Sequence, residues 1–528
     1  MAYYKDLREY ISVLDENNKL VRINREINKD TELHPLVRWQ FRGLPESQRK
    51  AFLFENVTDV KGKKYGTPVL VAAHAASREV YGLAIKCKPD EIIDKWANAR
   101  VNPIEPRMVE SGPIHEEIHM GDSLLEHGGL DEFPVPNSTP GFDNAPYLTT
   151  PCWVTKDPDT GIRNLGIYRG MIKSQTRVGA ECYLPQHMRM HREKCREKGM
   201  QGMPAAIVLG ATPNISLISA SKVPYGVDEY SVAGGVAGAP VELVKCKTVD
   251  LEVPATAEIV IEGIISTEFL ERDGPFGEYT GYMSVGIPTM YMDVTCITHR
   301  KKPVLNCFIS QFPPSESSTI RGEGFSASYY KFLKHDLGCH NVVDVAFHKN
   351  SGAKAWVSIS VKKPKRDEVW RILNAAAAFD ATSGKIIVLV DDDIDPHDIE
   401  SVVWAMCFRI QPLNDIRFTP GKSQSLDPSA APPEELMAGK GLRPTSAVMI
   451  DATMKWNYPP VSLPKKEFMD RAKKIWEEEG LPALNPKTPW YGYSLGHWTE
   501  EDIEEAKLAL EGEHYQTGEK LDSQRIKG

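Results

Sequence analysis

The segment ERDGPFGEYTGY, residues 271–282, places three acids and an arginine around a Gly-Pro-x-Gly turn that ends in aromatic residues. Glycine and proline supply tight-turn conformations and acids are well solvated, so one interpretation is an exposed surface turn. The other interpretation is that the turn carries its carboxylates into a site. An arginine flanked by two carboxylates holds one acid ionised and anchors an anionic substrate, while burial raises the pKa of the other toward that of a proton donor. Such a set suits binding a carboxylate and protonating a carbon.

A second concentration of polar groups lies in the stretch NLGIYRGMIKSQTRVGAECYLPQHMRMH. Asn164 and Arg169 are five positions apart on a predicted strand, so they face opposite sides unless the strand bulges or twists. His187 and His191 have the spacing of zinc-binding histidines on a helix, but H-E-x-x-H requires glutamate where this chain has Met188. A zinc protease is therefore disfavoured, and a structural role and a metal-ligand role both stay open for His187.

Two further stretches carry acids next to turns. Asp228 and Glu229 precede a glycine cluster, but no strand leads directly into it and no acid follows at the Rossmann distance, so we do not interpret it as a nicotinamide site. The run VLVDDDIDPHD lacks the glycine and the final glutamate of an EF-hand and is interpreted as capping a strand and a helix. Asn164, His187 and Glu229 together suit an octahedral site for Mg²⁺ or Mn²⁺, completed by phosphate oxygens.

The bulk composition describes a globular protein with two or three domains. The chain has 528 residues, of which 41% are hydrophobic, and its formal net charge of -9 disfavours a nucleic-acid partner. No apolar run has the length of a membrane span, and the start MAYYKDLREY lacks the apolar core of a signal peptide. We therefore expect a cytoplasmic protein without a membrane partner. The nine cysteines are scattered without a C-x-x-C pair, which favours reduced thiols.

Hydrophobic periodicity divides the chain into a sheet-rich part and an alternating part. Residues 7–14 read as a helix and 20–23 as a strand, and strand-like runs then alternate with Gly/Pro turns until about residue 310, which predicts a closed or partly closed sheet. Strands and helices alternate afterwards, which predicts a mostly parallel sheet covered on both faces. One charged helix and a polar tail end the chain. The expected divisions are 1–315, a linker helix at 316–340, a C-terminal domain at 341–495, and a tail at 496–528.

Several motifs resemble, in order and spacing, those of the UbiD-like family of decarboxylases, which use prenylated FMN. These motifs are NLGIYR (164–169), QH (186–187), DE (228–229), KTVDLEVPATAEIVIEG (247–263), DGPFGEYTGY (273–282), DDDID (391–395) and IDATMKW (450–456). The resemblance covers most of the chain and is weakest in the tail. It implies an α/β (α+β) fold in which an N-terminal split β-barrel domain binds the flavin. A linker helix would connect it to a doubly wound C-terminal α/β domain that closes the pocket and mediates oligomerisation.

The resemblance also implies a cofactor site. Asn164, His187 and Glu229 would bind the divalent metal that bridges to the flavin phosphate, either Mn²⁺ or Mg²⁺ with Fe²⁺ as a further option, and K⁺ would lie nearby. Lys385 resembles a basic position that contacts the cofactor in some members. The residues expected to line the modified flavin ring are Ile167, Tyr168, Arg169, Gln186 and His187.

Three residues would carry catalysis in this resemblance. Glu278 would be the proton donor, Arg169 the anchor for the substrate carboxylate, and Asp273 the second acid. The family commonly has glutamate at that second position, so the reach of the shorter Asp273 is a question for the structure. Prenylated FMN would act as the covalent electrophile.

The implied reaction is reversible, non-oxidative decarboxylation of an aromatic or other α,β-unsaturated acid. A flavin prenyltransferase would serve as the maturation partner, and a homodimer or homohexamer is expected. Two alternatives stay open: a catalytically silent flavin-binding or assembly protein, and a subunit of a physiological aromatic carboxylase.

Overall fold

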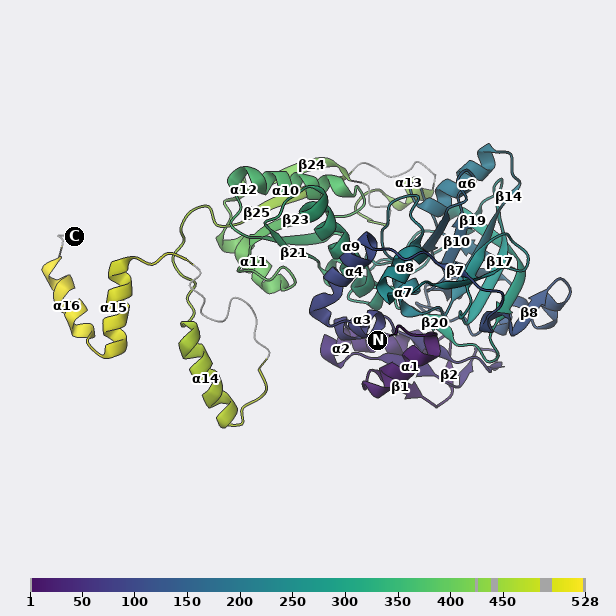
Figure 1. The fold of residues 1–528 in the computed structure, drawn as a ribbon, viewed down its shortest axis with the longest axis horizontal. Coiled ribbons are helices and arrows are strands. Elements are labelled where there is room, and N and C mark those ends of the chain that lie inside the picture. The colour runs from purple at the N-terminus through teal and green to yellow at the C-terminus, as the bar shows by residue number, and fades with distance from the viewer. Residues whose placement is uncertain (1, 423–425, 438–444, 485–495, 526–528) are drawn as a thin grey trace.

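The computed structural model describes residues 2–422, 426–437, 445–484 and 496–525, and its opening segment is helical as expected (Figure 1). Helix α1 (Leu7–Glu16) buries Leu7, Ile11 and Leu14 on one face, and the carboxylate of Asp6 caps it by accepting a hydrogen bond from the Glu9 amide. Strand β1 follows at Leu20–Ile23 and pairs in parallel with β3 (Ala51–Phe54). The predicted helix, turn and strand are therefore all present.

The N-terminal segment packs beside a large curved sheet through a small sheet of its own. That small sheet has the order β1-β3-β6-β20, so its last strand returns from more than 200 residues later in the chain. The elements of this segment not yet given are β2 (Ile27–Asn28), α2 (Leu33–Gly43), β4 (Val57–Thr58), β5 (Lys64–Tyr65), β6 (Val69–Val71), α3 (Arg78–Ile85), α4 (Ile92–Val101) and β20 (Leu305–Cys307).

The large sheet curls until its two ends meet. Its strand order begins with β11 (Arg163–Ile167) and ends with β12 (Gly170–Ser174) and β9 (Tyr147–Leu148). Ile167 and Gly170 lie three positions apart in the chain, a span of at most about 11 Å, yet they belong to strands separated by five others in the sheet. The ends of the sheet must therefore approach each other, which makes a partly closed barrel. This confirms the sheet-rich N-terminal region expected from the sequence.

The middle of the barrel is built from long antiparallel strands. The order continues from β11 through β10, β14, β17, β19 and β13 to β12, and β8 and β18 pair with different parts of β19. These strands are β8 (Glu117–Met120), β10 (Cys152–Lys156), β13 (Arg177–Ala180), β14 (Gly202–Leu209), β17 (Ile259–Ser266), β18 (Glu271–Asp273) and β19 (Ile287–His299). A small neighbouring sheet contains β7 (Arg107–Met108), β15 (Glu242–Lys245) and β16 (Glu252–Pro254).

Three helices pack against the barrel and direct their first residues toward its edge. Helix α6 (His187–Glu197) and α8 (Glu229–Ala237) begin at residues that the sequence predicted as metal ligands, and α7 (Pro213–Ser219) lies beside α8. Asp228 is the N-cap of α8, where its carboxylate accepts a hydrogen bond from the Tyr230 amide. The amide groups at a helix N-terminus favour negative charge, so these two ends suit an anionic ligand.

The alternating part forms a second sheet after a long helix. Helix α9 (Glu316–Lys331) continues into a π-helical turn (Phe332–Asp336), and the sheet order is β21-β22-β23-β25-β24. The pairs β22-β23 and β23-β25 are parallel, whereas both edge strands are antiparallel. The strands are β21 (Val342–Phe347), β22 (Trp356–Val361), β23 (Ile386–Asp391), β24 (Ile416–Lys422) and β25 (Thr445–Ala452).

Helices cover both faces of this second sheet, as the alternation predicted. Ile387 and Leu389 of β23 pack with α10 (Arg366–Phe379), whereas Val388 and Val390 pack with α11 (Ile399–Phe408). Side chains alternate across a strand, so one apolar run serves both faces. Two short helices, α12 (Pro412–Asp415) and α13 (Pro433–Met437), complete the described part of this region.

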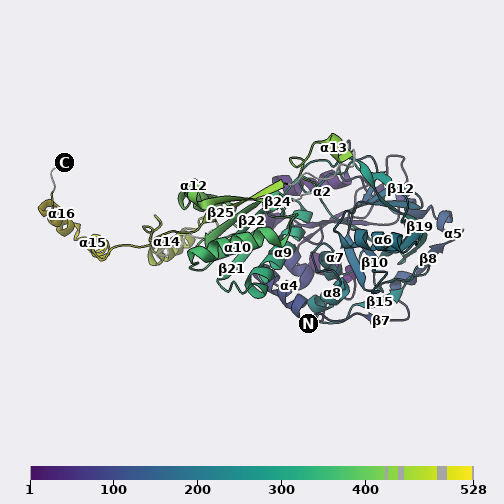
Figure 2. The same cartoon turned by 90° about the horizontal axis from the view of Figure 1, so that it is seen from above.

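The C-terminal arm leaves the body of the protein (Figures 1 and 2). It contains α14 (Lys466–Glu478), α15 (Glu500–Glu511) and α16 (His514–Ser523), and none of the residues of these helices is buried. The sequence predicted one charged helix after residue 496, but Gly512 adopts a left-handed φ of 81° that ends α15 and separates it from α16. The predicted boundary at 495 lies outside the described residues. No helix in the described ranges is both long and apolar enough to span a bilayer.

Candidate active site

Arg169 occupies the seam where the two ends of the barrel meet. The strand that carries Asn164 ends at Ile167, so Arg169 lies in the link to the next strand and the expected strand alternation does not apply to it. The side chain is 6% exposed, and its Nε lies 3.0 Å from Oδ1 of Asp273. Its Nη1 contacts the carboxylates of Glu181 and Glu278. The guanidinium also lies 5.3 Å from the centre of the Phe276 ring.

The turn after β18 brings its acids into this buried position. Pairing of β18 with β19 fixes Asp273, and the turn then reverses at Gly274, which has a φ of 96° that favours glycine. The side-chain amide of Asn144 donates a 2.9 Å hydrogen bond to the Gly274 carbonyl, and the hydroxyl of Tyr147 accepts one from the Gly274 amide. The turn is therefore packed against the barrel and is not a solvated surface loop.

The two acids of the turn differ in exposure. The side chain of Asp273 is fully buried, whereas that of Glu278 is 12% exposed. The shorter Asp273 still reaches Arg169, because β18 carries its backbone directly beside the guanidinium. Burial raises the pKa of Asp273, although the charge of Arg169 acts in the opposite direction. Both acids therefore contact the arginine, and Asp273 is the more deeply buried of the two.

Glu181 is a third carboxylate on the same guanidinium, and the sequence reasoning missed it. It follows β13, is 8% exposed, and accepts a hydrogen bond from the hydroxyl of Tyr183. Burial raises the pKa of Glu181 to about 7 even though Arg169 opposes that shift. Burial alone would lower the pKa of Arg169, but the charges of these carboxylates raise it. The sequence does contain a signal for Glu181, because this acid stands alone between the apolar residues VGA and CYL. An ionised side chain buried in such a context requires a partner.

The predicted metal ligands also converge. Oδ1 of Asn164 on β11 lies 3.0 Å from Nδ1 of His187, the first residue of α6. Glu229, the first residue of α8, accepts a 2.8 Å hydrogen bond from the amide of Leu165, the neighbour of Asn164. One strand and two helix N-termini therefore bring together three residues, of which the first and the last are 65 positions apart in the chain.

The chemistry of these three side chains fits a divalent cation. Glu229 is 2% exposed, and within the described residues no basic side chain forms an ion pair with it. Burial raises the pKa of Glu229 to about 8, because its charge lacks compensation. Burial and then Lys222 lower the pKa of His187, which favours the neutral imidazole that binds metals. The side-chain nitrogen of Asn164 is buried without a hydrogen bond.

The remaining predicted cofactor residues lie at the same edge, with one exception. Ile167 ends β11, the Tyr168 carbonyl accepts a 2.7 Å hydrogen bond from the Trp153 indole, and Gln186 is the N-cap residue of α6. Lys385 instead lies before β23, where its ammonium is 2.7 Å from Asp427. In the described part of the chain its ammonium bonds to Asp427 and Ser429 and not to the barrel, so its cofactor role stays a prediction.

The second sheet contributes cations that the sequence reasoning also missed. Tyr279, next to Glu278, is buried against this sheet, and the guanidinium of Arg321 on α9 lies 4.4 Å from the centre of its ring. The ammonium of Lys354 lies 5.2 Å from the same ring, and burial lowers its pKa to about 8. Lys222 forms a 2.9 Å ion pair with Asp380 across the two parts of the chain. The turn that carries Glu278 and Tyr279 is therefore in contact with both parts of the chain.

Comparison with known proteins gives the class to which this architecture belongs. Residues 11–100, 107–312 and 320–452 match the N-terminal, Rift-related and C-terminal domains of the 3-octaprenyl-4-hydroxybenzoate carboxy-lyase family. These stretches take in most of the chain. The protein therefore belongs to the UbiD family of carboxy-lyases, as the motifs indicated.

Individual relatives extend over nearly the whole chain. An evolved dimeric form of the UbiD-class enzyme HmfF from Pelotomaculum thermopropionicum, in complex with prFMN, is 29% identical with a TM-score of 0.74 and covers 87% of this chain and 97% of its own. The closed form of vanillic acid decarboxylase from Sedimentibacter hydroxybenzoicus is 25% identical with a TM-score of 0.78, covering 90% and 100%. An uncharacterised protein from Archaeoglobus fulgidus is 28% identical over 503 residues, covering 90% and 98%.

Proposed function

We propose that this carboxy-lyase catalyses the reversible, non-oxidative decarboxylation of an aromatic or other α,β-unsaturated carboxylic acid. The observation that supports it most strongly is the buried Arg169 guanidinium held between Asp273 and Glu278. A fixed guanidinium is suited to binding a carboxylate in two hydrogen bonds. The complex of the HmfF enzyme with prFMN and the substrate of the vanillic acid decarboxylase support the same class of reaction.

In this proposal Arg169 orients the substrate carboxylate and Asp273 keeps the guanidinium in place. Arg169 has five N–H donors, and the deep acid occupies only the side at Nε. Nη2 is buried without a hydrogen bond, so a donor of the arginine is available to an incoming acid. Burial of Phe276 and Tyr147 around the guanidinium excludes water and strengthens its attraction for an anion.

Glu278 then supplies the proton that replaces the carboxyl group. Loss of CO₂ leaves an electron pair on the carbon that carried it, and the Glu278 carboxyl donates its proton to that carbon. Glu278 suits this role better than Asp273, because its side chain is the more exposed of the two. The reverse sequence, in which Glu278 removes the proton and the carbon attacks CO₂, gives the carboxylase direction.

The proposed cofactor is prenylated FMN, which when bound would supply the electrophilic group that accepts the electron density of the leaving carboxylate. Asn164, His187 and Glu229 would hold a divalent cation, Mn²⁺, Mg²⁺ or Fe²⁺, at the phosphate end, with K⁺ nearby. Support comes from the two helix N-termini and the uncompensated Glu229. Maturation by a flavin prenyltransferase follows from this cofactor.

We also propose a homo-oligomer in which the C-terminal part contacts a second copy. Within the described residues, a groove of about 900 Å³ lies along residues 408–417 and 455–459. Three apolar side chains of this groove are widely exposed, with Leu413 at 96% and Phe408 and Trp456 each at 68%. Exposed apolar surface of this kind is typical of protein interfaces. Light scattering of the full chain, and of a variant with Leu413→Glu and Phe408→Glu, tests this part of the proposal.

The first experiment is co-expression with a flavin prenyltransferase, anaerobic purification, and determination of the mass and absorption spectrum of the released cofactor. Prenylated FMN with an equivalent of divalent metal is the expected result. The holoenzyme is then screened against aromatic acids for CO₂ release. Ordinary FMN, or no cofactor, would contradict the proposal and favour a catalytically silent flavin-binding protein.

The catalytic assignment is tested with Glu278→Gln. We expect this variant to retain the cofactor and to lose about 10²- to 10⁴-fold of the decarboxylation rate, the range for general acid catalysis. Glu271→Gln is the matched control, since Glu271 lies in the same segment but pairs with Arg177 at the surface. Equal loss of activity in both variants would contradict a specific role for Glu278.

A further inference from the structure

A second cluster of ionisable side chains lies at the far end of β19 from the catalytic turn. It consists of His119 on β8, His127 after the short helix α5 (Ser123–Glu126), Glu132 at the end of a 3₁₀ turn (Gly129–Glu132), and His299, the last residue of β19. The catalytic turn pairs with the first residues of β19, so the two places are about 40 Å apart along the strand. The proposed decarboxylation uses none of these four residues.

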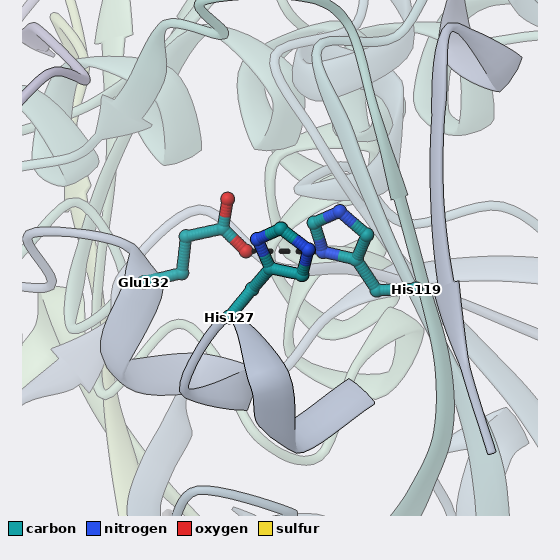
Figure 3. Close-up of side chains that lie close together, drawn as sticks. All are labelled: His119, His127 and Glu132. Carbon is teal, nitrogen blue, oxygen red and sulfur yellow. Dashed lines mark ion pairs between the residues drawn. The ribbon is translucent and has the colours of Figure 1, made fainter. Parts of the chain in front are cut away.

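Strand pairing explains why two of the histidines meet. In the ladder between β8 and β19, His119 lies opposite Ile297, so His119 and His299 are diagonal neighbours on one face. Their rings are 5.0 Å apart and nearly perpendicular. The chain then turns back through α5, which stacks the His127 ring on His119 with centres 3.9 Å apart. Figure 3 shows the Glu132 carboxylate approaching the same two rings.

The distances between ligand atoms suit a small metal ion. Nδ1 of His119 lies 3.2 Å from one oxygen of Glu132, and Nε2 of His299 lies 3.4 Å from the other. Ligand atoms of His119, His127 and Glu132 all lie within 4.8 Å of one another. In a tetrahedral zinc site with 2.0–2.1 Å bonds, neighbouring ligand atoms are roughly 3.3 Å apart. The ligand atoms are therefore close enough to share one ion once the exposed His127 ring turns out of its parallel stack on His119.

Unsatisfied atoms indicate that a positive charge belongs between these groups. Nδ1 of His299 is 2.8 Å from the Arg300 carbonyl, which can only accept, so Nδ1 carries a proton. In the neutral ring the lone pair of Nε2 then faces a carboxylate oxygen of Glu132. Among the described residues, that nitrogen, Nδ1 of His119 and the second oxygen of Glu132 are buried without a hydrogen bond. His119 and His299 are only 6% and 5% exposed.

We propose that His119, His127, Glu132 and His299 form a binding site for one Zn²⁺ ion. Three imidazoles and a carboxylate are the borderline ligands that Zn²⁺ prefers, whereas Mg²⁺ and Ca²⁺ favour all-oxygen sites. The hydrogen bond from His299 to the Arg300 carbonyl fixes the ring orientation, as outer partners do in zinc sites. His127 is exposed and closes the site on the solvent side.

The ion would fasten the segment 117–133 to the barrel. Apart from the β8 ladder, this segment is held by few backbone hydrogen bonds, one of them from the Leu130 amide to the Gln175 carbonyl at 2.8 Å. The chain continues from Glu132 to Asn144, which donates a hydrogen bond to Gly274 in the catalytic turn. The role of this metal is therefore structural. It stabilises the start of a segment whose end supports the active site.

The test uses the full chain, dialysed against EDTA and then against metal-free buffer. ZnCl₂ is added, excess metal is removed, and zinc is counted by inductively coupled plasma mass spectrometry. We expect one zinc per chain in the wild type and its loss in His127→Ala and His119→Ala. His115→Ala and His187→Ala are the matched controls and should keep the zinc, the first because it lies just before this segment and outside the cluster, the second because it lies at the other candidate metal site. Zinc retained by His127→Ala, or lost from His187→Ala alone, would overturn the proposal.

Two further measurements start from the wild-type protein. Wild-type protein loaded with Co²⁺ should show the intense visible absorption of a tetrahedral ion, and the absence of that absorption would contradict the site. EDTA should lower the thermal unfolding midpoint of the wild type but not that of His127→Ala, whose side chain is exposed and costs little to remove. An unchanged wild-type midpoint would show that the four side chains form only a histidine–glutamate ion pair.

Discussion

Two buried sites at the edge of the barrel handle negative charge in opposite ways. Around Arg169, three carboxylates share one guanidinium that belongs to the chain itself. Around Glu229, a carboxylate is equally buried, but among the described residues it receives only backbone hydrogen bonds and no cation. The first site contains a cation of the chain itself, whereas the described part of the chain supplies none to the second. A buried charge without a partner is costly, and this cost is the physical basis for the proposal that Glu229 binds a cation.

The largest test of this comparison is Arg169→Met. Removing the cation leaves Glu181 and Asp273 buried without compensation, and breaking a buried ion pair costs about 3–5 kcal/mol. We expect a large fall in the free energy of unfolding, measured by urea denaturation, and loss of decarboxylation. Arg177→Met is the matched control, because Arg177 pairs with Glu271 and Asp293 but is 40% exposed, where such pairs contribute about 0–1 kcal/mol. Similar costs for both variants would contradict the comparison.

The opposite expectation applies to Glu229→Gln. This change removes the uncompensated charge, so the metal-free protein should unfold at the same temperature as the wild type or at a higher one. Affinity for Mn²⁺ should fall by at least about tenfold, since even outer partners of a metal have effects of that size. Calorimetric unfolding and a Mn²⁺ titration followed by electron paramagnetic resonance measure the two effects. A lower unfolding temperature with unchanged Mn²⁺ binding would show that Glu229 is a structural residue.

The smallest effect concerns pH and Glu181→Gln. Burial raises the pKa of Glu181 from 4.5 to about 7, so between these values the folded protein binds more protons than the unfolded chain. The free energy of unfolding therefore falls as pH rises through this window, with a slope set by a difference of at most one bound proton between the two states. Glu181→Gln should make this decline shallower. Unfolding midpoints between about pH 5 and pH 8 measure the slope. The slope should not change in Glu271→Gln, and an unchanged slope in Glu181→Gln would contradict the shifted pKa.

Local sequence signals predicted individual helices and strands far better than the contacts between them. The apolar spacing of Leu7, Ile11 and Leu14 predicted α1, and the run at 385–390 predicted a buried strand with helices on both faces. Motif order predicted the family and brought forward Arg169, Asp273 and Glu278, which the structure brings together. The expectation that Arg169 alternates along a strand failed, because β11 ends at Ile167 and the barrel seam begins there.

Residues outside any motif were not predicted. Glu181 lies twelve positions from Arg169 in the chain, and nothing in its spacing says that β13 ends beside the guanidinium. His119 and His299 are separated by 180 positions and meet only because β8 pairs with the last residues of β19. Similarly, the tail contains two helices where one was expected. The helices are separated at Gly512, and the sequence does not show whether a glycine adopts the left-handed conformation that ends a helix.

The sequence by itself determined the class of protein and most of the helices and strands, and it singled out Arg169, Asp273 and Glu278, which the structure brings together. These properties depend on residue type and short spacing, which act within one helix or strand. Only the tertiary structure decided which acid lies deepest beside Arg169, that Glu229 lacks a cation, and that three histidines and Glu132 converge. Those outcomes depend on strand register and barrel closure, which join residues far apart in the chain through packing that no local pattern encodes.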